Sequence, residues 1–162
     1  MFEAVVTFRK RLEKGQILIG SAIYLTDPQA SEALADSVDF LWIDLEHGAM
    51  SEEALRGHLL AARGKNKPAF VRVAGSSTPF IKPVLDAGAN GIVVPQVRGA
   101  EEVRQVVADC RYPPVGRRGF GPLVPSNYGR DAGAEYIARA NAHIFVAVMI
   151  ETTEALQAID DK

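Results

Sequence analysis

Short apolar segments alternate with helix-like segments along almost the whole chain, and this alternation limits the possible folds more than any other feature. The apolar segments have the composition of strands buried on both faces, and they cover residues 17–23, 40–45, 69–73, 91–94 and 143–150. The segments between them carry apolar residues at helical spacing or helix-capping residues, over residues 28–37, 51–64, 78–88, 100–111 and 131–140. Two more helices are expected, over residues 2–12 and from Thr152 or Thr153 onward. Alternating strands and helices predict an α/β fold with a parallel sheet and right-handed crossovers.

The segment 112–130 interrupts this alternation. It contains four prolines, four glycines and the adjacent pair Arg117 and Arg118, which is too rich in breakers for a regular helix or strand. We expect either a long ordered loop or a distorted fifth strand here. With that strand, the chain has six strand–helix units.

Polar side chains recur where successive strands are expected to end, at residues 44–47, Arg72, Gln96 and Glu151. Catalytic residues occupy this position in β/α barrels, because the carboxyl ends of the strands line the active site. No Gly-x-Gly-x-x-Gly motif follows the first apolar segment, so the usual dinucleotide-binding interpretation has no support. These features favour a (β/α)8 TIM barrel. Since eight units take about 250 residues, we expect residues 1–162 to form a single barrel domain, truncated at the C-terminus to about six units.

The composition excludes several classes of partner. The formal charge of −2 gives no reason to expect binding to nucleic acid or to an anionic membrane. No apolar run in the sequence approaches the roughly 20 residues that span a bilayer, and residues 1–10 lack the layout of a signal peptide. The single cysteine, Cys110, excludes an intramolecular disulfide framework and fits a reducing compartment. We therefore expect a cytoplasmic protein with small-molecule partners.

Asp44, Glu46 and His47 follow an apolar strand and precede Gly48. Residues 44 and 46 share a face by the period of two, whereas His47 reaches Asp44 only if the chain turns at Gly48. A carboxylate that is hydrogen-bonded to an imidazole fixes the tautomer of the imidazole and raises the basicity of the ring, which a general base at neutral pH requires. Alternatively, Asp44 caps a neighbouring backbone and His47 is a surface loop residue.

Arg72 lies inside an apolar strand, where a guanidinium is costly to bury without an anion. Either an internal carboxylate neutralises it, or it binds an anionic substrate or enolate. Glu151 ends another apolar run. Its carboxylate is either a ligand for a hard metal ion or a cap for the following helix.

The remaining candidates carry less information. Asp86 is expected to be a solvated or helix-capping acid unless a loop brings it to the site. Hydrogen bonding to the backbone is enough to explain a glutamine at position 96, Gln96. Arg117 and Arg118, with the glycines around them, match a weak anion-binding pattern. Structural roles are expected for His58, for His143 and for Cys110, which falls on an apolar helix face.

These motifs, in this order, resemble the HpcH/HpaI family of class II pyruvate aldolases. The resemblance is carried by the segments DFLWIDLEHG, FVRV, LDAGANGIVVPQV, RYPPVGRRGFG and MIET. The family includes 4-hydroxy-2-oxoheptanedioate, 2-dehydro-3-deoxyglucarate and 2-keto-3-deoxyrhamnonate aldolases. The resemblance implies a metal-dependent β/α barrel of the phosphoenolpyruvate/pyruvate type. Such an enzyme reversibly cleaves 4-hydroxy-2-oxo acids into pyruvate, or a related 2-oxo acid, and an aldehyde.

The resemblance also implies roles for individual residues. His47 matches the proton acceptor; Asp44 would assist it, and Asp86 would make it more basic. Arg72 matches the residue that stabilises the enolate oxygen. Glu151 matches one of two carboxylate ligands of a divalent cation such as Mg²⁺, Mn²⁺ or Co²⁺.

Two positions depart from the family pattern. Met149 stands where many relatives have a glutamine that contacts the substrate, so we treat it as a candidate substrate contact. The second metal carboxylate belongs to a Gly-Pro-x-Asp-Leu pattern in the next strand and loop, and no such pattern occurs before Lys162.

Three hypotheses follow. In the first, the chain is the N-terminal two-thirds of such an aldolase, whose intact form is by resemblance a homo-oligomer, a hexamer of swapped dimers. In the second, it is a non-catalytic barrel fragment that lacks half of the metal site and serves as an assembly or binding module. In the third, it is a carbon–carbon lyase acting on an acyl-CoA, as in relatives of the citrate lyase β-subunit. Six strands cannot close an eight-stranded barrel, so we expect the isolated chain to be poorly soluble or to associate.

Overall fold

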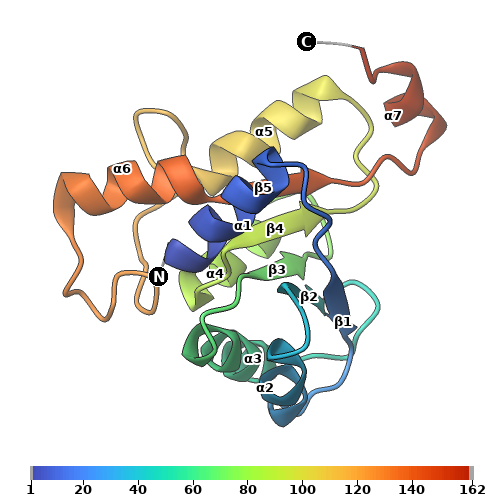
Figure 1. The fold of residues 1–162 in the computed structure, drawn as a ribbon. Helices are drawn as coiled ribbons and strands as arrows, with labels where there is room; N and C mark the ends of the chain where they lie inside the picture. The colour runs from blue at the N-terminus through green and yellow to red at the C-terminus, as the bar shows by residue number, and fades with distance from the viewer. Residues whose placement is uncertain (1, 161–162) are drawn as a thin grey trace.

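The computed structural model describes residues 2–160, which form an α/β fold around a parallel five-stranded sheet (Figure 1). The strands are β1 (Gly20–Ile23), β2 (Phe40–Asp44), β3 (Ala69–Arg72), β4 (Gly91–Val94) and β5 (Phe145–Val148). The helices are α1 (Glu3–Glu13), α2 (Gln29–Ala35), α3 (Glu52–Gly64), α4 (Thr78–Ala87), α5 (Ala100–Cys110), α6 (Gly133–His143) and α7 (Thr153–Gln157). The strands lie in the sheet in chain order, and each neighbouring pair is parallel. This confirms the predicted parallel α/β fold.

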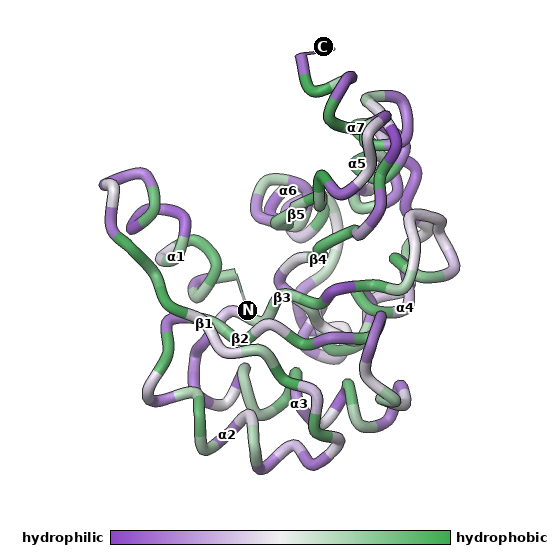
Figure 2. The backbone as a smooth tube through the Cα atoms, turned by 90° about the vertical axis from the view of Figure 1, so that its right-hand side faces the viewer, coloured by the Kyte–Doolittle hydropathy of each residue, from purple (hydrophilic) through white to green (hydrophobic). Residues whose placement is uncertain are grey.

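Side chains that alternate along each strand divide between two apolar layers. On one face, residues such as Ile43 and Ile92 pack against α3, α4 and α5 in the larger core cluster. On the other face, Phe70 packs against Phe8 of α1, with ring centroids 4.9 Å apart. Figure 2 shows α1 on one side of the sheet and α2 and α3 on the other. The central strands β3 and β4 are therefore buried on both faces, whereas most residues of β1 and β5 are half-buried.

Residues 112–130 form a loop with turns, not a distorted fifth strand. Its backbone hydrogen bonds are largely local, for example from Gly116 N–H to the Tyr112 carbonyl and from Asn127 N–H to the Val124 carbonyl. The described residues thus contain five strands, and the expected count of six strand–helix units was wrong by one. The breakers that made this segment irregular also kept it out of the sheet.

Two further expectations about the apolar pattern differ from the structure. The first strand is shorter than residues 17–23, because its pairing with β2 begins only at Gly20, and Ile17 is 88% exposed. The predicted buried face of α3 holds for Leu55 and Leu59, whereas Leu60 is 43% exposed. Leu60 lies one residue, and so about 100° around the helix, beyond Leu59.

Cys110 lies in the interior, as predicted, and His58, for which a structural role was predicted, is also buried. His58 is fully buried in α3, and its Nδ1 lies 2.8 Å from the Ser31 hydroxyl of α2. Cys110 belongs to the larger core cluster. His143 ends α6, and its ring lies 5.9 Å from that of Phe2. These contacts agree with structural roles for the three residues.

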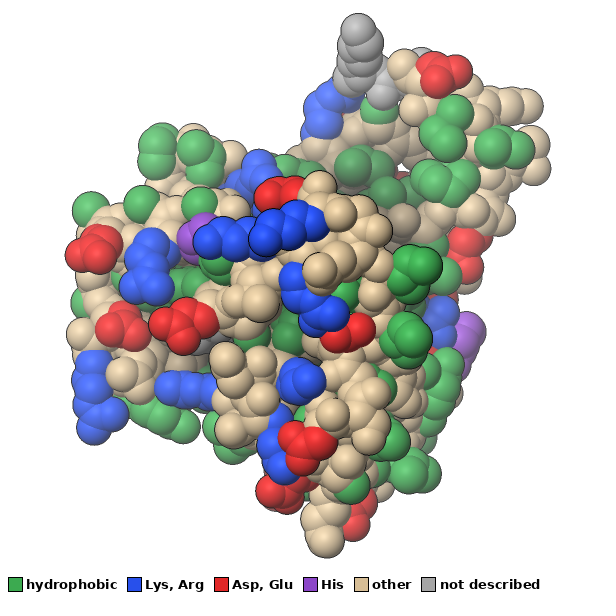
Figure 3. All heavy atoms as spheres, in the orientation of Figure 1, with side chains coloured by type: hydrophobic (Ala, Val, Ile, Leu, Met, Phe, Trp, Pro, Cys, Tyr) green, Lys and Arg blue, Asp and Glu red, His purple; other side chains and the backbone are tan. Residues whose placement is uncertain are grey.

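Within residues 2–160 the sheet is open, with β1 and β5 as its outer strands. Charged side chains of both signs are interspersed with apolar ones over the face that Figure 3 shows. Every helix in the described part of the chain falls short of the length or the apolar character that a membrane span requires.

Candidate active site

The candidate site lies at the carboxyl ends of β2 and β3. Asp44 is the last residue of β2, Arg72 is the last residue of β3, and the two are direct partners in the parallel register. By the period of two, Arg72 projects from the same face as Phe70, and Asp44 from the same face as Trp42. Phe70 and Trp42 belong to the apolar layer that packs against α1. The two charged side chains therefore continue that layer at the edge of the sheet where barrel enzymes hold their catalytic residues.

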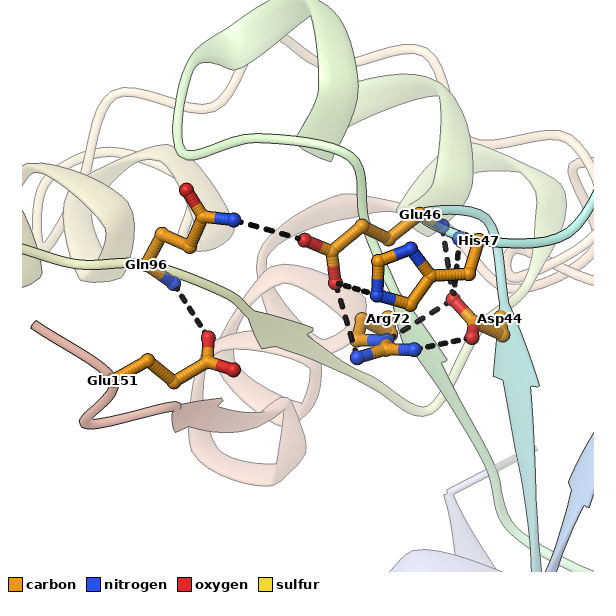
Figure 4. A network of polar contacts seen from close by, with 6 residues as sticks. All are labelled: Asp44, Glu46, His47, Arg72, Gln96 and Glu151. Atoms are coloured by element: carbon orange, nitrogen blue, oxygen red, sulfur yellow. Dashed lines mark hydrogen bonds and ion pairs between the residues drawn. The ribbon is translucent and has the colours of Figure 1, made fainter.

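Asp44 and Arg72 form a bidentate ion pair (Figure 4). Arg72 Nε donates to Asp44 Oδ1 at 3.0 Å, and Arg72 Nη2 donates to Oδ2. Asp44 is fully buried, and only 8% of Arg72 is exposed. Burial by itself raises the pKa of Asp44, but the hydrogen bonds from Arg72 and from two backbone N–H groups outweigh it and leave this pKa lowered. The bond to Asp44 in turn raises the pKa of Arg72, so the pair is charged at neutral pH.

Glu46 supplies a second carboxylate to Arg72. Arg72 Nη1 lies 3.0 Å from Glu46 Oε2, so the guanidinium is held between two acids. The chain bends directly after β2, over residues 45–48, where Asp44 Oδ1 accepts the backbone N–H of Glu46 at 2.9 Å. Gly48 fits this turn because a Cβ there would lie 2.6 Å from the Asp44 carbonyl oxygen. The motif DLEHG thus builds the loop that carries both acids.

His47 lies beside this network with an exposed ring. The side chain is 66% exposed, and Nε2 lies 3.8 Å from Glu46 Oε2. Asp44 contacts His47 through the backbone, because its Oδ1 accepts the His47 N–H at 3.3 Å. Of the two sequence interpretations of Asp44, backbone capping is therefore present. The carboxylate nearest to the ring is that of Glu46.

Gln96 and Glu151 lie at the ends of the next two strands. The Gln96 backbone N–H donates to Glu151 Oε2 at 2.9 Å, and its side-chain amide lies 3.5 Å from Glu46 Oε1. Figure 4 shows Gln96 between Glu46 and Glu151. The polar residues at or just after the ends of β2, β3, β4 and β5 therefore form one connected network.

Among residues 2–160, no group of three or more His, Cys, Asp or Glu side chains is arranged to hold a metal ion. Glu151 is exposed, and its backbone partner occupies one carboxylate oxygen. The donor chemistry suits a hard cation, but the described residues supply one candidate ligand and not a complete site.

Two predicted site residues have other neighbours. Asp86, on α4, bonds to Lys82 Nζ at 2.5 Å and to Arg118 at 2.6 Å. Arg118 is therefore paired with a carboxylate within the chain. Met149 is half-buried and packs against the apolar layer that includes Phe70. The structure thus brings together four of the six predicted site residues: Asp44, His47, Arg72 and Glu151.

A cleft of about 530 Å³ begins at Glu46 and Gln96 and extends between α4 and α5. Its far side is formed by Thr78, Asp109 and Arg117. Asp109 is buried and accepts hydrogen bonds from Thr78 Oγ1 at 2.8 Å and from Arg117 Nε at 2.5 Å. The lining is rich in hydroxyl, amide and charged groups, which suits a polar ligand.

Sequence reasoning missed two of these arrangements. The ion pair between Glu46 and Arg72 was not predicted, although the period of two already placed residues 44 and 46 on one face. The Asp109–Arg117 pair joins a helix to the irregular loop that follows it. No local sequence pattern indicates that contact.

The family model described as HpcH/HpaI aldolase/citrate lyase matches residues 26–161. The chain belongs to the HpcH/HpaI aldolase/citrate lyase family. The predicted resemblance is thereby confirmed.

Individual family members are similar over nearly the whole chain. A hydroxypyruvate/pyruvate aldolase of Roseovarius nubinhibens is 37% identical over 157 residues, which cover 96% of this chain and 61% of that protein. A 2-keto-3-deoxy-L-rhamnonate aldolase of Escherichia coli K12 is 36% identical over 157 residues, covering 95% of this chain and 58% of that protein. The solved structure of the citrate synthase SbnG matches with a TM-score of 0.82 and 37% identity, covering 94% of this chain and 59% of that one. The chain thus spans about three-fifths of the length of these relatives.

Proposed function

We propose that the intact protein is a class II aldolase, a carbon–carbon lyase that cleaves a 4-hydroxy-2-oxo acid into pyruvate, or a related 2-oxo acid, and an aldehyde. The observation that carries this proposal is the Arg72 guanidinium, fixed at the carboxyl edge of the sheet by Asp44 and Glu46. The relatives named as pyruvate and rhamnonate aldolases support it. The proposal includes closure of the sheet into a single barrel domain and assembly into a homo-oligomer.

Arg72 is suited to stabilise an enolate. Cleavage of the C3–C4 bond leaves an electron pair that rests on the C2 oxygen, where a fixed positive charge lowers the energy of the transition state. Two of the five guanidinium N–H groups donate to Asp44, and Nη1 forms an ion pair with Glu46, so N–H groups on Nη1 and Nη2 are left for a ligand. Because two carboxylates fix its orientation, Arg72 needs little rearrangement when the enolate forms.

His47 is the proposed general base. Its ring is exposed beside Arg72's partner Glu46, so it can take the proton from the C4 hydroxyl directly or through a water. Assistance from Asp44 and Asp86 stays a prediction. In the structure Asp44 accepts the His47 backbone N–H, and Asp86 is bonded to Lys82 and Arg118.

Glu151 is the proposed metal ligand of this chain. When bound, a divalent cation such as Mg²⁺, Mn²⁺ or Co²⁺ supplies a Lewis acid that polarises the keto oxygen of the substrate. The Gln96 N–H holds the Glu151 carboxylate in place at the end of β5. Met149 stays a candidate substrate contact, predicted from its position two residues before Glu151.

The test is pyruvate release by the intact protein with a divalent cation and a series of 4-hydroxy-2-oxo acids. We expect Arg72→Lys to lower kcat/KM by at least about 100-fold, because a point charge replaces an oriented guanidinium. His47→Ala should lower kcat by about 10²–10⁴-fold. Since the His47 side chain is mostly exposed, that variant should unfold at the wild-type temperature. Full activity in both variants would refute the proposal.

A second candidate is carbon–carbon bond formation in the synthetic direction, favoured by the match to a solved citrate synthase. The same enolate stabilisation by Arg72 serves condensation with an acceptor carbonyl. The third hypothesis from the sequence, a carbon–carbon lyase that acts on an acyl-CoA, differs because its substrate is a thioester. Product analysis with pyruvate and acetyl-CoA as alternative enolate donors, each with oxaloacetate as the acceptor carbonyl, distinguishes these reactions.

A further inference from the structure

The side-chain amide of Gln96 has no role in the function proposed above, although it lies at the centre of the candidate site. We propose that Gln96 is a substrate-binding residue whose amide N–H donates to the 2-oxo acid and so selects its orientation between Arg72 and Glu151. This inference rests on the proposed function and deepens it, because it adds a residue that recognises the 2-oxo acid part of the substrate.

The backbone of Gln96 has an uncommon conformation. Its φ is +52°, in the left-handed region that L residues other than glycine, asparagine and aspartate seldom adopt. In this conformation the backbone N–H donates to Glu151 Oε2 at 2.9 Å. Strained residues of this kind cluster at functional sites, where the surrounding structure holds them. Gln96 thus fixes a carboxylate with its backbone while its side chain stays available.

The side chain of Gln96 is exposed and lines the cleft together with Glu46. Its Nε2 lies 3.5 Å from Glu46 Oε1, at the limit of hydrogen-bonding distance. This contact is weak, and the amide keeps donor and acceptor capacity for a ligand. A neutral donor between two carboxylates suits an anionic ligand better than a third acid would.

The neighbouring strand supplies no competing amide at this position. Met149, the residue predicted to contact the substrate, packs against the apolar layer below the site. Met149 N–H bonds to the Val94 carbonyl, which places the end of β5 directly beside the end of β4. The amide that follows β4 therefore lies beside the end of β5, and Figure 4 shows it directed toward Glu46, the acid that pairs with Arg72.

The experiment measures pyruvate binding to the intact, Mn²⁺-loaded protein by isothermal titration, together with KM for pyruvate in the aldol direction. Gln96→Met keeps the length of the side chain and the backbone N–H but removes the amide. Gln105→Met is the matched control, because Gln105 lines the same cleft on α5 but bonds to Glu101. We expect Gln96→Met to weaken pyruvate binding and raise KM by about tenfold, the effect of one lost hydrogen bond to a charged ligand, and Gln105→Met to change neither.

Two further variants separate substrate binding from a structural role. Gln96→Gly relieves the positive φ and keeps the N–H, so it should fold normally, bind Mn²⁺ as the wild type does and show the same loss of pyruvate affinity. Gln96→Asn should restore part of the affinity. Wild-type pyruvate affinity in both Gln96→Met and Gln96→Gly would overturn the inference.

The two proposals fail in different ways. If the wild type bound pyruvate but cleaved no 4-hydroxy-2-oxo acid, the proposed function would fail while the binding measurements still decided the role of Gln96. If the wild type did not bind pyruvate at all, both proposals would be wrong.

Discussion

Replacement of Asp44 by asparagine tests how the site is built. Asp44 accepts four hydrogen bonds, two from Arg72 and two from the backbone N–H groups of Glu46 and His47. An asparagine at this position keeps one acceptor oxygen but presents an amide N–H₂ group to the guanidinium and removes the negative charge. Breaking a buried ion pair by removing one partner costs about 3–5 kcal/mol. Because Glu46 still lies 3.0 Å from Arg72, we expect the lower end of that range, about 3 kcal/mol.

The assay is urea unfolding of the intact protein at pH 7, with thermal unfolding as a second measure. A loss of about 3 kcal/mol corresponds to a decrease in Tm of about 6–12 °C for a protein of this size. The control is Asp36→Asn, which removes a carboxylate that is 68% exposed in its pair with Lys65 and should cost less than about 1 kcal/mol. A cost for Asp44→Asn no greater than for this control would refute the reasoning.

The pH dependence gives this prediction a sign. The folded-state pKa of Asp44 is lowered from its ordinary value of 3.8. Its contribution to stability is therefore complete above that value and is lost as the pH falls through the folded-state pKa. The difference in stability between wild type and Asp44→Asn should be constant from pH 7 to about pH 5 and should shrink at lower pH.

The remaining predictions concern three other residues. Burial lowers the pKa of His58 from 6.5, so the folded state favours the neutral ring and the free energy of unfolding should fall as the pH decreases below about 6.5. In His58→Gln, the unfolding midpoint measured between pH 5 and 7.5 should depend less on pH. Burial raises the pKa of Cys110 to about 12, so its reaction with a thiol reagent at pH 8 should be slow in the folded protein and fast in urea, and fast labelling of the native protein would contradict this burial. Removal of the metal with a chelator should abolish turnover, and addition of Mg²⁺ or Mn²⁺ should restore it. Glu151→Gln should raise the cation concentration required for half-maximal activity at least tenfold, which titration of activity against free metal measures.

The sequence predicted the alternation of elements well because that signal is local. The apolar segments of β2, β3 and β4 are short and continuous, and capping serine and glycine residues mark α3 and α4, so periodicity located them to within a few residues. The exposed ends of the first segment, Ile17 and Ile19, show the limit of the method. Apolar composition favours a strand, but only pairing with β2 decides where that strand begins.

The site was predictable where strand position decides it. Asp44 and Arg72 end β2 and β3, Glu151 follows the end of β5 by three residues, and parallel strands bring such ends to one edge of a sheet. The partner of each charge was not predictable, because it depends on side-chain contacts between distant segments. Thus Asp86 was linked to His47 by resemblance, whereas its carboxylate bonds to Lys82 and Arg118.

The most direct test of the account follows the enolate itself. The intact protein, supplied with a divalent cation and pyruvate in D₂O without an aldehyde, should exchange the methyl protons of pyruvate for deuterium, which proton NMR detects as loss of the methyl signal. We predict exchange by the wild type and at least about 100-fold slower exchange by Arg72→Lys. Absence of exchange in the wild type, or equal rates in the two proteins, would contradict the claim that Arg72 stabilises a pyruvate enolate.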